Sequence, residues 1–217
     1  MKRLAILLLA FAFAVVACGG GDDPTLTLEP PTDAPSTRLE IDPAELDDGL
    51  LTTAEVGEGW QRDDDAVPST VQIGGQVGPA NLDSAEADET SAFEQTDGSG
   101  YITNNLFLLQ NGDTAHEWIE LHRRADGTKT WEQDREDGGT ASNKNNGPIT
   151  DLPALGDEMY TAKIAVTITD GDGVTTERRV HYVVYRIDRL LAFVIAQDAD
   201  AAEYARKQEA RVARLAA

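Results

Sequence analysis

The strongest candidate for chemistry in this sequence is its single cysteine, Cys18. It follows an apolar run from Leu4 to Val16, with Ala17 directly before it and glycines directly after it. A cysteine thiolate is a strong nucleophile, and a lone cysteine has no intramolecular disulfide partner. This arrangement therefore favours covalent modification of the Cys18 sulfur over disulfide formation.

The segment before Cys18 has the layout of an export signal. Lys2 and Arg3 give a positive start, and the apolar run is about half the length that a membrane-spanning helix needs. With Ala17 and Cys18 at its end, the segment resembles the lipobox of bacterial lipoproteins. That resemblance implies that residues 1–17 are a signal peptide, cleaved between Ala17 and Cys18, and that fatty acyl groups such as palmitate are attached to Cys18.

The lipobox resemblance implies a location at the cell membrane, lipid-anchored on the extracytoplasmic side. Two acyl chains suffice for stable anchoring, because each buried methylene contributes about 0.8 kcal/mol. The alternative is an ordinary secretory signal in which Cys18 is incidental.

The other patterns that could support catalysis or metal binding fail on spacing. His116 and His122 are six positions apart, whereas the zinc-protease motif needs histidines four apart. Residues 170–173 (DGDG) begin like a calcium loop but continue with Val174, which predicts a hairpin turn instead. Residues 98–100 (GSG) lack the spacing of a nucleophile elbow. We therefore expect no catalytic residues, no metal site and no cofactor, and we expect the protein not to be an enzyme.

Trp60 and Trp131 are the candidates to line a ligand cleft. Aromatic residues make up only 6% of the chain, and a tryptophan in such a domain is more often part of the core, so a core position is the alternative for each. Trp131 lies between the predicted helix over residues 114–125 and residues 134–150, which are rich in Gly, Asn and Asp. We predict that residues 134–150 form a mobile surface loop with Trp131 at its hinge.

The charge of the chain restricts its partners. The formal net charge is -21, and it becomes -23 without residues 1–17, which contain Lys2, Arg3 and no acidic residue. Such a surface does not bind nucleic acid through phosphate neutralisation, and anionic lipid headgroups repel it. We therefore expect the lipid, not the protein surface, to make the contact with the membrane.

Turn residues and hydrophobic periodicity divide the chain after its signal peptide into two parts. Residues 18–41 are predicted to be the lipidated N-terminus and a disordered linker, because they offer little apolar surface. Residues 42–217 are predicted to be a single extracytoplasmic domain. Capping signals predict helix starts at Pro43 and Thr53.

The periodicity predicts further helices over residues 81–89, 114–125 and 198–215, and strands over residues 71–73, 91–96, 101–110, 160–169, 175–186 and 190–196. The expected fold class is α+β, an antiparallel sheet of about five strands with helices packed on one face.

Three stretches carry a second resemblance, namely residues 50–60 (LLTTAEVGEGW), 152–158 (LPALGDE) and 183–194, which hold VVYR and LLAFV. Together they resemble the extracytoplasmic sensor-type domain of actinobacterial serine/threonine kinases and of related stand-alone lipoproteins. That resemblance implies a sheet backed by helices and a ligand cleft, and it implies no reaction. Members of that family usually carry paired cysteines, whereas residues 19–217 contain none.

These observations favour a lipid-anchored binding or sensing module of the bacterial cell envelope whose ligand is an unknown small molecule. The alternative is a structural or chaperone-like envelope protein that binds other proteins. A deep apolar cleft favours the first hypothesis, and a flat exposed apolar patch favours the second. An enzyme ranks third. A pocket that holds two or more titratable groups with shifted pKa values would favour it.

Overall fold

The computed structural model describes residues 40–63, 85–125, 131–135 and 138–215. They belong to one compact unit that extends from Thr37 to Ala217. The predicted signal peptide, Cys18, the predicted linker and the predicted strand over residues 71–73 lie outside the described residues. In the part of the chain that is described, no helix is both long and apolar enough to cross a membrane.

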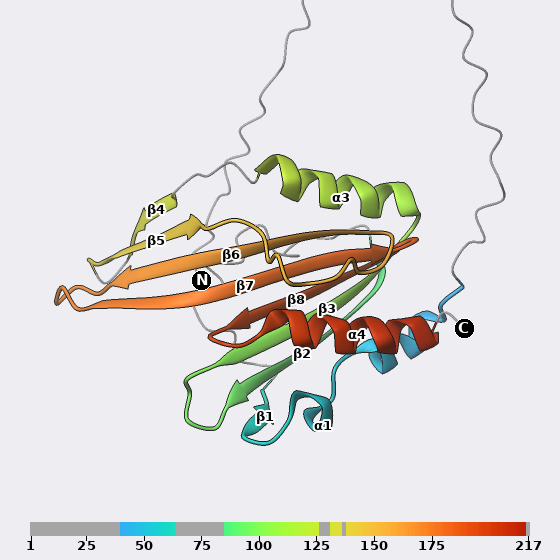
Figure 1. Cartoon of the computed structure of the whole chain (residues 1–217), viewed down its shortest axis with the longest axis horizontal. Coiled ribbons are helices and arrows are strands. Elements are labelled where there is room, and N and C mark those ends of the chain that lie inside the picture. Colours follow the sequence, from blue (N-terminus) through green and yellow to red (C-terminus); the bar gives the residue numbers. More distant parts are fainter. Residues whose placement is uncertain (1–39, 64–84, 126–130, 136–137, 216–217) are drawn as a thin grey trace, which may run out of the picture. The chain divides into compact units, whose positions relative to one another are not determined.

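The described residues form a short 3-10 helix, three α-helices and eight β-strands (Figure 1). In chain order these are η1 (Pro43–Gly49), α1 (Thr53–Val56), β1 (Trp60–Arg62), β2 (Ala85–Gln95), β3 (Tyr101–Leu109), α3 (Gly112–Ala125), β4 (Trp131–Asp134), β5 (Thr140–Asn145), β6 (Glu158–Thr169), β7 (Thr175–Ile187), β8 (Leu190–Gln197) and α4 (Ala201–Leu215).

All the strands join one antiparallel sheet in the order β1-β2-β3-β8-β7-β6-β5-β4. The predicted α+β class, the hairpin of β2 and β3, and the meander of β6, β7 and β8 are confirmed. The predicted number of about five strands is too low, because the described residues alone contribute eight to the sheet. The additional strands β1, β4 and β5 lie at the two ends of this order.

Two sequence predictions in polar segments are wrong. The helix predicted over residues 81–89 is contradicted from Ala85 onward, where β2 begins and pairs with β3. The loop predicted over residues 134–150 contains β5, which pairs with β6 on one side and with β4 on the other. These strands have few buried side chains, so their sequences lack apolar alternation, and pairing with a neighbouring strand decides their structure.

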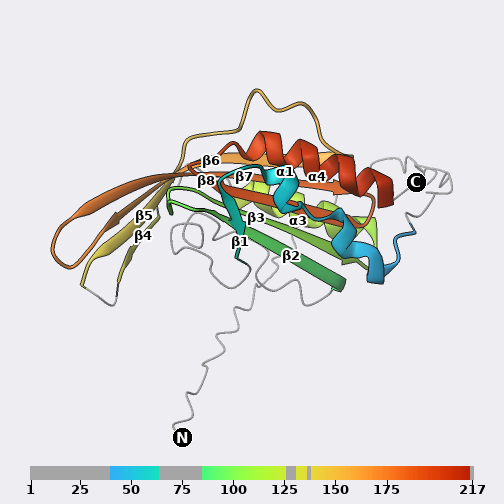
Figure 2. The same ribbon diagram turned by 90° about the horizontal axis from the view of Figure 1, so that it is seen from below.

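Helices cover both faces of the sheet, not one face as predicted (Figure 2). Alternate side chains of β8 enter two separate cores, one with α4 and one with α3. The α4 core contains Leu190, Ala192, Val194 and Ala196, and the α3 core contains Leu191, Phe193 and Ile195. Every residue of β3 and β8 is buried, and strands of this kind require cover on both faces.

The first helices begin as the capping signals predict. The Asp42 side chain accepts a hydrogen bond of 2.9 Å from the Ala44 amide and caps η1, with Pro43 at the start of the helix. Thr52 and Glu55 form the capping box of α1, in which a Glu55 carboxylate oxygen accepts a 2.9 Å hydrogen bond from the Thr52 amide. Short polar side chains thus fix where both helices start.

A buried asparagine joins this N-terminal segment to the sheet. Asn104 of β3 accepts a 2.9 Å hydrogen bond from the Leu51 amide, and its Nδ2 donates to the Ser91 carbonyl oxygen at 3.0 Å. Two side chains of α4 hold the same segment from the other side. Arg211 donates to the Asp48 carbonyl oxygen at 2.9 Å, and Lys207 donates to the Glu55 carbonyl oxygen at 2.7 Å. The opening segment is therefore an integral part of the α4 side of the domain.

Candidate functional site

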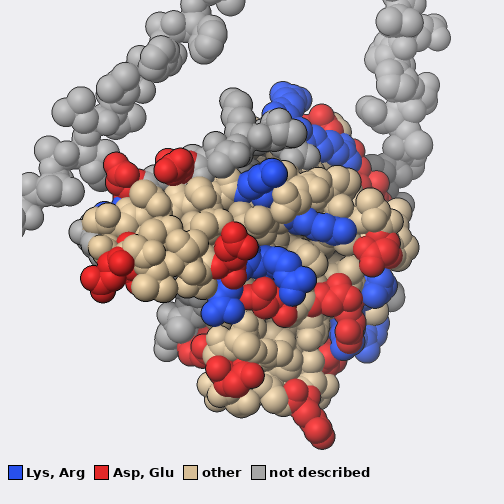
Figure 3. Space-filling model, turned by 60° about the vertical axis from the view of Figure 1, so that its left-hand side comes forward, with Lys and Arg blue, Asp and Glu red and all other residues tan. Residues whose placement is uncertain are grey.

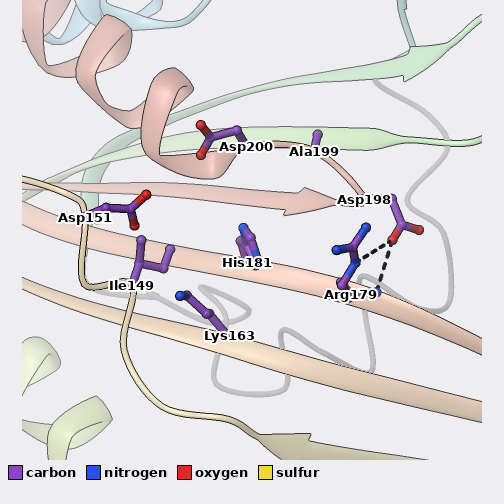
Figure 4. A pocket seen from close by; sticks show the side chains of 8 residues that line it. All are labelled: Ile149, Asp151, Lys163, Arg179, His181, Asp198, Ala199 and Asp200. Carbon is purple, nitrogen blue, oxygen red and sulfur yellow. Dashed lines mark hydrogen bonds and ion pairs between the residues drawn. The ribbon is translucent and has the colours of Figure 1, made fainter.

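The candidate site is a pocket on the α4 face of the sheet, where α4 begins and the sheet continues beyond it (Figure 4). We call it the His181 pocket. Its volume is about 350 Å³, at the lower end of the range for small-molecule sites, which is roughly 300–1,000 Å³. The described residues that line it are Ile149, Asp151, Lys163, Arg179, His181, Asp198, Ala199 and Asp200.

Strands β6 and β7 supply the floor of the His181 pocket. Lys163 of β6 lies directly opposite His181 of β7 in the strand register, and His181 in turn lies opposite Ala196 of β8. Successive side chains of a strand alternate between the faces of a sheet. Because Val183 and Tyr185 belong to the α4 core, His181 and Arg179 project to the α4 face as well. The register thus brings Lys163, His181 and Arg179 together.

The turn from β8 into α4 forms one wall. Asp198 has a positive φ of 51°, a left-handed conformation that non-glycine residues seldom adopt. Its carboxylate accepts a 3.3 Å hydrogen bond from the Arg179 amide and lies 3.8 Å from Arg179 Nε and 3.4 Å from Arg178 Nη1. Two residues on, the Asp200 carboxylate accepts a 3.0 Å hydrogen bond from the Ala202 amide at the start of α4. Asp198 thus closes the edge of the pocket, and Asp200 stands over its floor.

The segment between β5 and β6 forms the opposite wall. The Ile149 side chain is buried in the α4 core, and the Ile149 amide donates a 2.9 Å hydrogen bond to Thr161 Oγ1. Asp151 follows and is exposed to solvent. Residues 146–150 of this segment belong to the loop that the sequence predicts to be mobile, yet the buried Ile149 side chain and the hydrogen bond of its amide anchor the segment against β6.

His181 is the most unusual group in the pocket. Its Nδ1 atom is buried and has no hydrogen-bond partner among the described residues. Burial lowers the pKa of His181, and the Lys163 and Arg179 charges lower it further, while the Asp200 and Asp151 carboxylates oppose them. The imidazole is therefore neutral at pH 7, with one nitrogen as donor and the other as acceptor. Leaving a buried polar atom without a partner costs about 1–3 kcal/mol, and such sites are usually completed by water or a ligand.

Lys163 is the second group of the floor that is available to a ligand. No described residue forms a hydrogen bond or an ion pair with its ammonium group. Arg179, by contrast, has an ion-pair partner in Asp198, whose carboxylate lies 3.8 Å from its Nε atom. On the face shown in Figure 3, basic and acidic side chains lie next to one another, so the surface there does not form one large area of a single sign. The pocket has the same mixed character, and it does not match a deep apolar cleft.

Of the two tryptophans predicted to line a cleft, Trp60 is not among the described residues that line this pocket, and the side chain of Trp131 lies outside the described part of the structure. Trp60 begins β1 and packs against the α4 core, where its ring makes an edge-to-face contact with Tyr204 at 6.2 Å between centroids. Trp60 is therefore partly buried at the border of the α4 core. Trp131 begins β4, where the register places it opposite Asn143, so its predicted position at the hinge of a loop is wrong. Cys18 and Ala17, the predicted lipidation and cleavage residues, lie outside the described residues.

The two histidines of α3 occupy different environments. His116 is exposed and its Nδ1 lies 2.7 Å from a Glu158 carboxylate oxygen. His122 is buried, within 2.7 Å of the Trp118 carbonyl oxygen and 2.8 Å of the Tyr182 hydroxyl group. The described residues contain no group of three side chains that could hold a metal ion. Both histidines therefore support the packing of α3 on the sheet.

The DGDG segment, in turn, is the hairpin turn that the sequence predicts. The Val174 amide donates a 2.8 Å hydrogen bond to the Asp170 carboxylate, and the Asp170 amide donates to the Val174 carbonyl oxygen at 3.0 Å. Asp170 thereby closes the connection between β6 and β7.

The functional side chains of the pocket are not marked in the sequence. Lys163 and His181 belong to polar positions of two strands, and only the register of β6 on β7 makes them neighbours. Asp198 and Asp200 form an acidic start to the last helix, and this pattern predicts a helix cap as readily as a binding site. No motif analysis would select these residues as a site.

Comparison with known proteins supports the fold alone. No protein-family model matches the chain, and no curated protein matches it. Among solved structures, the chain is similar to the extracellular domain of PknH from Mycobacterium tuberculosis, with a TM-score of 0.55 and 12% sequence identity over 82% of this chain and 98% of that chain. The predicted resemblance to the extracytoplasmic domains of actinobacterial kinases is therefore confirmed in the architecture, and this chain has the fold of that extracellular domain.

Proposed function

We propose that this protein is a lipid-anchored, extracytoplasmic binding or sensing module of the bacterial cell envelope, and that it binds a small molecule in the His181 pocket. The observation that carries the proposal is the floor of that pocket, where the half-buried imidazole of His181 lies beside the unpaired ammonium group of Lys163. Two unused polar groups side by side in a pocket are typical of a binding site.

The location rests on two separate supports. The first is the lipobox-like end of the apolar run at Ala17 and Cys18. The second is the likeness in fold to a domain that is extracellular in its own protein. Replacing Cys18 by alanine should abolish incorporation of labelled fatty acid and release the protein from the membrane fraction. If the Cys18→Ala protein still incorporates the label, the lipid anchor is not on Cys18 and this part of the proposal fails.

We also propose that the protein binds without catalysing a reaction. The described residues that line the His181 pocket include one histidine and no serine, threonine or cysteine, so a nucleophile beside a base is not assembled there. Binding in the pocket suits a sensor, since a ligand that bridges β7 and the start of α4 ties two elements of the domain together.

The test of binding is mass spectrometry of the small molecules that co-purify with the protein from its own envelope. The wild-type protein should retain a molecule that the His181→Leu protein loses, because leucine has no atom to replace the imidazole nitrogens. The matched control is His116→Gln on α3, which lies outside the pocket and should retain the same molecule. If all three proteins release the same molecules in the same amounts, the pocket is not the binding site.

Protein binding is the second candidate function, and one observation favours it. A depression on the outer face of α3 is lined by Thr114, Glu117, Trp118, Leu121 and Arg124. In the described part of the chain, Leu121 and Val174 are the large hydrophobic residues that are exposed, with 52% and 61% of their surface accessible. Loss of a co-purifying protein from Leu121→Glu, but not from His181→Leu, would favour this candidate over small-molecule binding.

A further inference from the structure

The charges in the His181 pocket are only partly neutralised within the protein. The Asp198 carboxylate is engaged by the Arg179 amide and lies near two guanidinium groups. In the described part of the chain, the Lys163 ammonium and the Asp151 carboxylate make no hydrogen bond. Asp200 uses one carboxylate oxygen, Oδ1, to cap α4, which leaves its other oxygen for a ligand. The pocket therefore presents one free cation and two carboxylates.

These free groups lie on different sides of the pocket. Lys163 and His181 lie side by side on the floor, whereas Asp151 belongs to one wall and Asp200 stands over the floor at the start of α4 (Figure 4). We propose that the pocket takes a zwitterionic small molecule, an α-amino acid with free amino and carboxyl groups. The ligand carboxylate binds the Lys163 ammonium group and a His181 ring N–H, and the ligand ammonium group binds Asp151 and Asp200.

The alternatives of a simple anion or a simple cation fit less well. An anion would use Lys163 but would face two carboxylates and the long-range repulsion of a chain with a formal net charge of -21. A cation would use the carboxylates but would place its charge against Lys163, which has no counter-ion among the described residues. A zwitterion has no net charge and satisfies both sides. Its two charged ends also form charge-assisted hydrogen bonds, which are roughly twice as strong as neutral ones.

His181 gives the site its orientation. A neutral imidazole carries one N–H, so it donates to the ligand carboxylate from that nitrogen and leaves the other nitrogen as an acceptor. Ile149 and Ala199 supply the apolar part of the pocket lining, which an apolar side chain of the ligand can contact. The charges of the pocket side chains determine the class of ligand, and the pocket volume of about 350 Å³ limits the size of the ligand's side chain.

This inference rests on the proposed binding function, and calorimetric titration distinguishes the two. The protein is residues 18–217 with Cys18→Ala, which removes the lipid site and keeps the whole chain that follows the predicted signal peptide. The probes are the common α-amino acids, together with N-acetyl forms that lack the ammonium group and amide forms that lack the carboxylate. The variants are Lys163→Met and Asp151→Asn, and the control is Lys144→Met, which removes a lysine of β5 that lies outside the pocket lining.

We expect at least one free amino acid to bind, and its N-acetyl and amide forms to bind at least tenfold more weakly. Lys163→Met and Asp151→Asn should each weaken binding at least tenfold, and Lys144→Met should change it less than twofold. Equal binding of the free and blocked forms would overturn the zwitterion. Binding of inorganic phosphate or spermidine, dependent on Lys163 or Asp151, would overturn it and leave the proposed function intact. If no probe binds and co-purification is unaffected by His181→Leu, both proposals fail.

Discussion

Asn104 offers the sharpest test of how the opening segment is attached to the sheet. Its side chain is fully buried, accepts from the Leu51 amide at 2.9 Å and donates to Ser91 at 3.0 Å for the carbonyl oxygen and 2.7 Å for Oγ. In Asn104→Ala the Leu51 amide loses its acceptor inside the core, which costs about 1–3 kcal/mol. The lost hydrogen bonds to Ser91 contribute about 1 kcal/mol more. We therefore expect the free energy of unfolding to fall by about 2–4 kcal/mol.

The measurement is urea unfolding followed by circular dichroism, with hydrogen exchange at the Leu51 amide as a local readout. Asn105→Ala is the matched control, because Asn105 is the next residue of β3, faces the other side of the sheet and donates to Thr90 in a less buried site. That variant should lose about 1 kcal/mol or less. Equal losses in the two variants, or unchanged exchange protection of Leu51 in Asn104→Ala, would refute the role assigned to Asn104.

Three further predictions concern single groups. Gly156 has a φ of 53°, and an added Cβ would lie 2.2 Å from the Arg186 carbonyl oxygen, so Gly156→Ala should lower the free energy of unfolding by at least about 2 kcal/mol in a denaturant titration. Burial raises the pKa of Glu158, but hydrogen bonds and charges from Arg186 and His116 lower it to about 2. The Glu158 carboxylate therefore stabilises the fold above pH 4.5, and this stabilisation is lost as the pH falls toward 2. We expect Glu158→Gln to have a lower free energy of unfolding than the wild type at pH 7 and the same free energy of unfolding near pH 2. Burial and the charges of Lys163 and Arg179 lower the pKa of His181, and the carboxylates of Asp200 and Asp151 only partly oppose this shift. Just below pH 6.5 the unfolded chain therefore binds more protons than the folded protein, and acidification destabilises the fold. We expect this loss of stability to be smaller in His181→Gln than in the wild type.

The recognisable motifs of this sequence describe the scaffold. In the LPALGDE stretch, Leu152 and Leu155 are buried in the α4 core, and the Gly156 amide donates to a Glu209 carboxylate oxygen of α4 at 2.6 Å. Asp157 accepts from the Asp188 amide at 2.6 Å in the turn between β7 and β8, and Glu158 accepts from Arg186 at 2.7 Å. A resemblance built on such residues predicts the architecture well, because these residues create it, and it carries no information about a ligand.

The extent of the sheet was harder to predict than its centre. The run from Leu190 to Ala196 is apolar throughout and does not alternate with polar residues. Continuous apolar runs are typical of strands that are buried on both faces, so helices are expected on both sides of the sheet. Strands β4 and β5, in contrast, are mostly polar, with the sequences WEQD and TASNKN. β5 is held by pairing with the edge of β6, and β4 is held by pairing with β5. Their structure depends on contacts far along the chain, so local sequence patterns cannot reveal it.

The pocket depends on the same long-range register. His181 lies beside Lys163 because β6 and β7 pair without a shift, and it shares the pocket with Asp200, which lies between the end of β8 and the start of α4. None of these residues stands out by type or spacing. The site emerges only when the strands are aligned and the unpartnered atoms are identified.

The central claim is that a small molecule binds at His181, and the side-chain nitrogen chemical shifts of the histidines test it most directly. The chain has three histidines, of which His116 and His122 lie on α3 and His181 lies in the pocket. The small-molecule fraction released from the envelope-purified protein is added back to ligand-free, ¹⁵N-labelled protein. The account predicts that the His181 nitrogens shift while those of His116 and His122 stay unchanged. Unchanged His181 nitrogens, or a shift confined to the α3 histidines, would contradict it.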